Sequence, residues 1–207
     1  MPNHYSPHKL YFKEAHALAD LQGIVQDLEW VICAANLYIK LEHSASVEKE
    51  AIYFAALAKY GRCFKTGVRR RISEEIVERA SADQREAHDY LINMRDKFIA
   101  HSVNEHEENY TVAYIKNAAT QTPEFSSVQI QHHRTVYMGD RAMESFSQIC
   151  TFWKDQVVGL ITEEKKVVER IAKQIPVSKI ISDASGDMML ASPKAGDEAK
   201  RRKQRIL

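Results

Sequence analysis

The chain has little of what interrupts regular secondary structure. Its 207 residues include only 7 glycines and 5 prolines, which argues against a loop-rich or collagen-like protein. Hydrophobic residues make up 44% of the sequence, so there is enough apolar material for a packed core. A chain of this length forms one domain with extensions, or two small domains at most.

Long apolar runs and an excess of either charge are also missing. No stretch approaches about eighteen consecutive apolar residues, so we expect no membrane-spanning helix. The first residues lack the basic start and apolar run of a secretory signal, and we therefore expect a cytoplasmic protein. Because the formal net charge is only +1, affinity for nucleic acid has to come from a local cluster of cations.

Cysteine is scarce as well. The three cysteines, Cys33, Cys63 and Cys150, are odd in number and far apart, which is not the pattern of a disulfide framework. All three lie within apolar helical patterns. We therefore expect free, buried thiols in a reducing compartment.

What the sequence does contain is apolar residues at helical spacing. This spacing predicts helices over about residues 18–41, 47–64, 82–101 and 143–171, with a short helix after Ser73. The last of these keeps a three–four rhythm for about eight turns. We interpret it as one wall of an intramolecular bundle, with a coiled-coil seam to a second chain as the alternative.

Between the last two long helices the period changes. Residues 110–116 and 127–137 alternate in polarity and are rich in β-branched and aromatic residues, which predicts a β-hairpin inserted at about 109–138. Residues 1–175 are thus expected to form a mainly α, up-and-down bundle of four to five helices with this insertion. Residues 176–207 are expected to form a flexible tail whose basic end either contacts nucleic acid or only solubilises the chain.

The segment from Met94 to His101 carries the clearest chemistry. Arg95 supplies a fixed cation that can bind a phosphate, Asp96 an adjacent carboxylate, and His101 a group that titrates near neutral pH. Internal attack by a ribose 2′-hydroxyl needs proton transfer near pH 7, which an imidazole provides. It also needs a cation that stabilises the charge developing on the pentavalent phosphate. An ordinary structural role is the alternative, because histidine is favoured at a helix C-terminus and arginine pairs with nearby carboxylates.

Helical geometry separates the two main residues of this motif. At about 100° per residue, Arg95 and His101 lie on opposite flanks of the apolar stripe, about 120° apart. They can form one site if the helix ends near Ala100 and His101 turns inwards. They can also form one if two copies pack across a two-fold axis, so that each Arg95 approaches the other chain's His101.

The motif resembles the arginine–polar–spacer–histidine signature of the HEPN superfamily, whose members are small helical bundles and include many RNases. The strict match covers under ten residues, and a looser similarity to the abortive-infection branch spans roughly the first hundred. The five-residue spacer between Arg95 and His101 lies within the family's range. The tyrosine found two residues after the histidine in the toxin subset is absent, since Val103 stands there, which argues against an antitoxin that modifies that tyrosine.

The resemblance implies a metal-independent RNA endonuclease with a toxin or phage-defence role and a composite site at the interface of a homodimer. It implies that Arg95 binds the scissile phosphate, that His101 transfers protons and that Asp96 orients its neighbours. The implied products are a cyclic phosphate and a 5′-hydroxyl. RNA, a second copy of the chain and an antitoxin or defence partner are the implied partners. The alternative is a non-catalytic helical module of the same fold that binds RNA or a partner protein, through the hairpin for example.

A basic stretch precedes the motif, from Tyr60 to Arg71. Its cations can hold an RNA backbone and its aromatic residues can stack a base, although a solvated helix end is the simpler interpretation. The predicted RNA-binding residues are Tyr60, Arg62, Lys65, Arg69, Arg70 and Lys97.

We expect neither a metal ion nor a cofactor. His101, Glu105 and His106 are near one another in sequence, but their spacing is not that of a helical zinc site and no cysteine joins them. A metal-dependent hydrolase built on these residues is the weakest of the three functional hypotheses.

Overall fold

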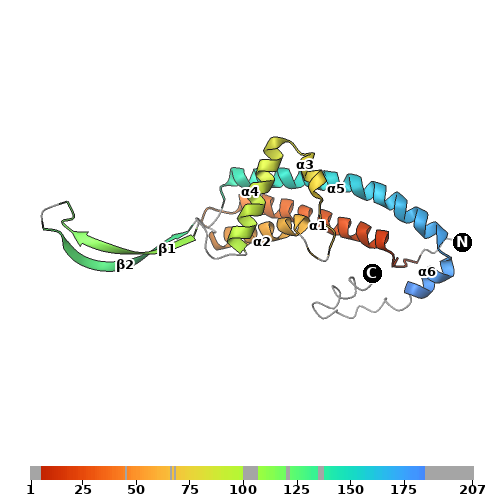
Figure 1. Cartoon of the computed structure of the whole chain (residues 1–207), viewed down its shortest axis with the longest axis horizontal. Helices are drawn as coiled ribbons and strands as arrows, with labels where there is room; N and C mark the ends of the chain where they lie inside the picture. The colour runs from red at the N-terminus through yellow and green to blue at the C-terminus, as the bar shows by residue number, and fades with distance from the viewer. Residues whose placement is uncertain are drawn as a thin grey trace.

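The computed structural model describes residues 6–44, 46–65, 67, 69–99, 107–119, 122–134 and 138–184. Within these ranges the chain forms helices and one pair of strands (Figure 1). The elements in chain order are α1 (Lys13–Lys40), α2 (Ser46–Phe64), α3 (Glu74–Glu78), α4 (Ala82–Ile99), β1 (Glu107–Lys116), β2 (Glu124–Arg134), α5 (Asp140–Gln174) and α6 (Val177–Ala184).

The long helices form a bundle in which α1 packs against α5 and α2, and α4 covers α2. The core consists of the apolar stripes that the periodicity predicts. On α5, for example, Met143, Phe146 and Trp153 are all buried. These stripes drive the assembly because each helix hides its apolar face only against its neighbours. The prediction of a mainly α bundle with an inserted hairpin is confirmed.

The inserted hairpin stands away from the bundle. Strands β1 and β2 pair antiparallel along their whole length, with a register shift between Tyr114 and Ile115. Figure 1 shows the hairpin projecting from one end of the bundle, while α6 lies at the other end. Within the described ranges, no helix is long and apolar enough to cross a membrane.

The predictions for the start of the C-terminal tail and for the burial of Cys33 are wrong. The tail predicted to begin at 176 starts instead with helix α6, because apolar residues recur there at helical spacing. Ile180 of this helix lines a pocket together with Leu10 and Phe12. The remainder of that predicted tail lies outside the described residues. Cys63 and Cys150 are free and buried as predicted, but Cys33 is exposed on the outer side of α1.

Candidate nucleic-acid interface

The last turns of α4 place Arg95 and Asp96 beside the end of α2. The Arg95 guanidinium donates from Nη1 to Asp96 Oδ1 at 2.8 Å, and Lys65 Nζ donates to Asp96 Oδ2 at 2.6 Å. One carboxylate is therefore shared by two cations from two helices. The three residues carry a net charge of +1 and leave the Arg95 side chain 32% exposed.

Gly61 determines where the Arg95 side chain lies. A Cβ atom added at Gly61 would be 3.0 Å from Arg95 Cγ and 3.1 Å from both Cδ and Nε. The arginine therefore crosses α2 directly over a residue that has no side chain. Its Nε atom is buried there without a hydrogen-bond partner. The guanidinium therefore makes fewer hydrogen bonds in this position than it could make in water.

The shared carboxylate stays ionised to low pH. Partial burial raises the pKa of Asp96, but hydrogen bonds from Lys65 and Arg95, together with their positive charges, outweigh it and hold the pKa below its ordinary value. At neutral pH the Lys65–Asp96–Arg95 group is thus fully charged.

A second carboxylate, on α1, gathers three more cations. Asp27 is buried, and Lys59 Nζ donates to its Oδ1 at 3.1 Å. The guanidinium groups of Arg62 and Arg69 form ion pairs with Oδ2 at 3.4 and 2.9 Å, although neither has hydrogen-bond geometry. This second group carries a net charge of +2 and includes two of the predicted RNA-binding residues.

These groups meet along the C-terminal half of α2. Lys59 and Arg62 are about one turn apart on α2 and face Asp27 of α1, and Lys65 follows just past the end of the helix and faces Asp96 of α4. Arg69 flanks this row from the following loop and Arg95 flanks it from α4. We call these five residues the cationic row. Each cation is held by a buried or partly buried carboxylate, which fixes its position without cancelling its charge.

Other predicted site residues are Arg70, Lys97 and His101. Arg70 donates its backbone N–H to Asp20 and pairs through its guanidinium with Glu164 at 2.8 Å, so it ties the loop to α1 and α5. Lys97 is exposed on α4. His101 lies outside the described residues, as do Glu105 and His106 of the cluster considered for a metal.

Tyr60 is in the core, and the prediction that it stacks an RNA base is wrong. Its side chain is completely buried, and the indole N–H of Trp153 donates to its hydroxyl at 3.1 Å. Burial raises the pKa of Tyr60 well above its ordinary value, so the hydroxyl keeps its proton. The hydroxyl also shares a hydrogen bond of 2.8 Å with His88 Nδ1.

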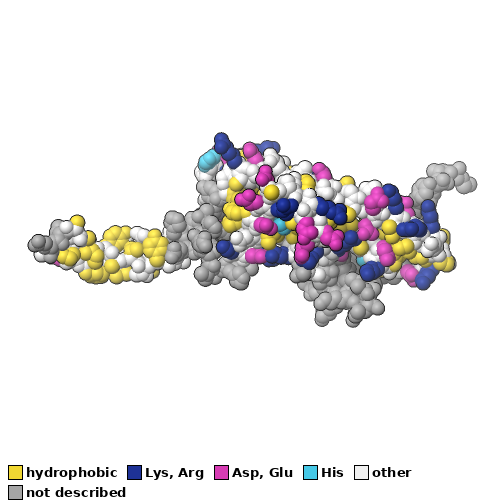
Figure 2. Space-filling view, turned by 45° about the horizontal axis from the view of Figure 1, so that its top comes forward, with side chains coloured by type: hydrophobic (Ala, Val, Ile, Leu, Met, Phe, Trp, Pro, Cys, Tyr) yellow, Lys and Arg dark blue, Asp and Glu magenta, His cyan; other side chains and the backbone are white. Residues whose placement is uncertain are grey.

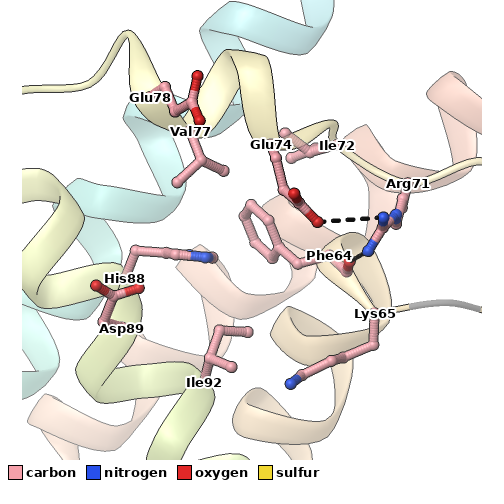
Figure 3. Close-up of a pocket in the computed structure, with 10 residues that line it drawn as sticks. All are labelled: Phe64, Lys65, Arg71, Ile72, Glu74, Val77, Glu78, His88, Asp89 and Ile92. Carbon is pink, nitrogen blue, oxygen red and sulfur yellow. Dashed lines mark hydrogen bonds and ion pairs between the residues drawn. The ribbon is translucent and has the colours of Figure 1, made fainter.

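His88 lines a pocket of about 310 Å³ between α2, α3 and α4 (Figure 3). Phe64 lies at its centre, with His88 and Ile92 on the α4 side and Lys65 and Arg71 opposite. Arg71 pairs here with Glu74 at 3.3 Å. The pocket has the volume of a small-ligand site, and its two cations, Lys65 and Arg71, are each paired with a carboxylate.

Residues that the sequence analysis missed hold the site in place. Gly61 was read only as part of a basic stretch, although a glycine inside a helix often marks a close approach of another group. Asp20 and Asp27 lie seven residues apart beside the apolar stripe of α1, and a buried carboxylate needs a cation. That spacing was the available signal for pairing α1 with the arginine-rich loop.

No protein family model, curated protein sequence or solved structure matches this chain, so the function is argued from its own residues.

Proposed function

We propose that the chain is a metal-independent RNA endonuclease of the HEPN type, acting in a toxin or defence role, with Arg95, Asp96 and His101 as its catalytic residues. The observation that carries this proposal is the placement of Arg95. Its guanidinium is held over Gly61 by Asp96, beside Lys65 and the rest of the cationic row. A guanidinium oriented in this way can bind a phosphodiester with paired donors.

In the proposed reaction the ribose 2′-oxygen bonds to the adjacent phosphorus while the bond from phosphorus to the 5′-oxygen breaks. His101 accepts the 2′-hydroxyl proton and returns a proton to the leaving oxygen. Arg95 stabilises the negative charge that develops on the phosphate oxygens. The products are a 2′,3′-cyclic phosphate and a 5′-hydroxyl, and the atoms balance without water or a metal ion.

Asp96 and the cationic row have supporting roles in this proposal. Asp96 keeps the guanidinium of Arg95 in one orientation, because a single bidentate carboxylate joins it to Lys65. Arg62 and Lys65 attract and position the flanking phosphates, which carry no sequence information. We place the complete site at the contact of two copies, where the Arg95 of one chain meets the His101 of the other.

The test is cleavage of a mixed panel of tRNA and mRNA by the purified chain in excess EDTA. We expect cleavage with cyclic-phosphate ends, and a loss of at least about a hundredfold in Arg95→Ala and in His101→Ala. Arg141→Ala is the matched control, since Arg141 is an exposed arginine on α5 outside the cationic row. Absent cleavage, or cleavage that both catalytic variants retain, would refute the proposal.

A second candidate is an RNA-binding module that does not cleave. It is favoured by the way in which Asp27 and Asp96 fix the cationic row independently of His101. Under this alternative, RNA binding weakens as the salt concentration rises, and it is weaker in Lys65→Ala than in the wild type. His101→Ala binds RNA like the wild type, and neither protein cleaves it. Measuring binding and cleavage on the same RNAs separates the two candidates.

A further inference from the structure

The β-hairpin exposes one long apolar face. Along the part of the ribbon beyond its base, the antiparallel register places six residues on this side, which we call the apolar hairpin face: Thr111, Ala113, Ile115, Phe125, Val128 and Ile130. Two polar pairs continue the same side at the base of the ribbon, Asn109 with His132 and Glu107 with Arg134. Its large side chains are exposed by 44% at Ile115, 65% at Phe125, 57% at Val128 and 78% at Ile130. Figure 2 shows the contrast, with hydrophobic side chains dominating the hairpin and charged ones interspersed over the bundle.

The other side of the same ribbon is different. It presents Tyr110, Val112, Tyr114, Lys116, Glu124, Ser127, Gln129 and Gln131. Gln131 donates to the Tyr114 hydroxyl at 3.2 Å. One side of the ribbon is therefore mainly apolar and the other mainly polar, as in a sheet that is covered on one face. No described helix of the bundle provides that cover to any substantial extent.

The chain just before and at the start of α5 is held by contacts with α1 and α2. Lys49 is only 2% exposed, pairs with Asp140 at 3.2 Å and lies 4.7 Å from the centre of the Tyr38 ring. The Tyr38 hydroxyl donates to the Met138 carbonyl, immediately before α5. A two-stranded ribbon alone is marginally stable in water, and an exposed apolar side of this extent marks a surface that another molecule covers.

We propose that the apolar hairpin face packs against the same face of a second copy of this chain. A two-fold contact brings identical patches together, so the patch must be complementary to itself. Its six residues carry no charge, and like-charge repulsion is therefore absent when two copies meet. None of these six residues is a lysine or arginine, so the face itself offers no cation to a phosphate backbone.

The size of the face determines how tight this contact is. Ten residues of strand at about 3.3 Å each and a width of about 10 Å give roughly 330 Å² per copy. Specific stable interfaces bury about 800 Å² per partner. The hairpins alone therefore support a concentration-dependent dimer, which contacts between the bundles can strengthen.

The connection to the proposed active site is short. Strand β1 begins six positions after His101, so its first residue is within about 20 Å of that histidine along the chain. If the two-fold axis runs along the ribbon, both bundles lie at the same end of the paired hairpins and the two Arg95–His101 motifs are close together. The inference rests on the proposed function only through the shared site, because its own test measures mass and cross-linking. A dimer that does not cleave RNA would refute the nuclease alone, and a monomer that cleaves RNA would refute the dimer and the shared site.

The test uses neighbouring residues on opposite sides of one strand. We expect the wild-type full chain to change from monomer to dimer with rising micromolar concentration in sedimentation equilibrium. Ile130→Glu should remain monomeric at concentrations at least tenfold above the wild-type midpoint. Gln129→Glu adds the same charge on the other side and should dimerise like the wild type.

A second variant covers the case in which Ile130→Glu disturbs the ribbon. In a Cys33→Ser background, Val128→Cys should form a disulfide-linked dimer on mild oxidation, and Ser127→Cys should not. A wild type that stays monomeric at all concentrations, or a dimer that survives in Ile130→Glu while Val128→Cys fails to cross-link, would overturn the proposal. So would a monomer that binds phosphatidylcholine vesicles only while Ile130 is intact, because a membrane would then be the occupant.

Discussion

At the scale of single residues, Gly61 is where one methyl group should alter the site. Gly61→Ala places Cβ against the Arg95 side chain, which must move by a few tenths of an ångström. We expect RNA cleavage to fall by about tenfold with the fold intact, since small displacements of a phosphate-binding group are costly.

Gly159→Ala is the control for this substitution. Gly159 is also inside a helix, but nothing lies within 4 Å of the position of its Cβ. Both changes gain the same helix propensity, so any difference between them reports on Arg95. Equal cleavage rates in the two variants would show that the position of Arg95 does not matter.

His88 should make the stability of the fold depend on pH. Burial lowers the pKa of His88 below its ordinary value of 6.5, with Lys65 adding to the effect and Asp89 opposing it. The unfolded chain therefore binds a proton more readily, and the free energy of unfolding should decrease as pH falls below about 6.5. Above that pH both states are neutral at this residue and its contribution does not change.

The measurement is urea unfolding at pH 5.5 and 7.5. The difference between the two pH values should be smaller in His88→Gln than in the wild type, and unchanged in His43→Gln, because His43 is exposed. If His88→Gln kept the full pH dependence, another group would be responsible.

At the scale of elements, α1 holds the arginine-rich loop through Asp27. Asp27→Asn removes the charge shared by Lys59, Arg62 and Arg69, and we expect a loss of about 1–3 kcal/mol in the free energy of unfolding. Asp155→Asn, an exposed carboxylate on α5, should change stability by less than about 0.5 kcal/mol. Equal effects in both variants would contradict the structural role given to Asp27.

Elements with a strong period could be predicted from the sequence, and contacts between them could not. The stripes of α1 and α5 and the alternation in the hairpin report burial directly, because each depends on residues close in sequence. Helix α6 does show a helical period in the sequence, but it is only eight residues long and precedes a polar stretch, so the whole segment resembles a flexible tail.

The site shows the same division. The cations of α2 and the Arg95–Asp96 pair were visible in the sequence. Their partners Asp27 and Gly61 were not, because the pairing arises only when α1, α2 and α4 pack together. Tyr60 was misplaced for a related reason: an aromatic residue beside arginines reads as a surface residue until its hydrogen bonds with Trp153 and His88 are known.

At the scale of the whole molecule, the bundle and the hairpin have separate roles in our account. The bundle carries the cationic row and Arg95 on a rigid scaffold, which favours a defined catalytic geometry. The hairpin projects from the bundle and offers an apolar surface to a second copy (Figure 1). Two chains joined in this way bring each Arg95 towards the His101 of the other.

The most direct measurement of this account mixes two inactive variants, Arg95→Ala and His101→Ala, and follows RNA cleavage in excess EDTA. Half of the randomly formed dimers are mixed, and each mixed dimer has one site with both an intact arginine and an intact histidine. The account predicts recovery of about a quarter of wild-type cleavage, which the Ile130→Glu substitution in both chains should abolish. A mixture as inactive as its two components, beside an active wild type, would contradict a site shared between two copies.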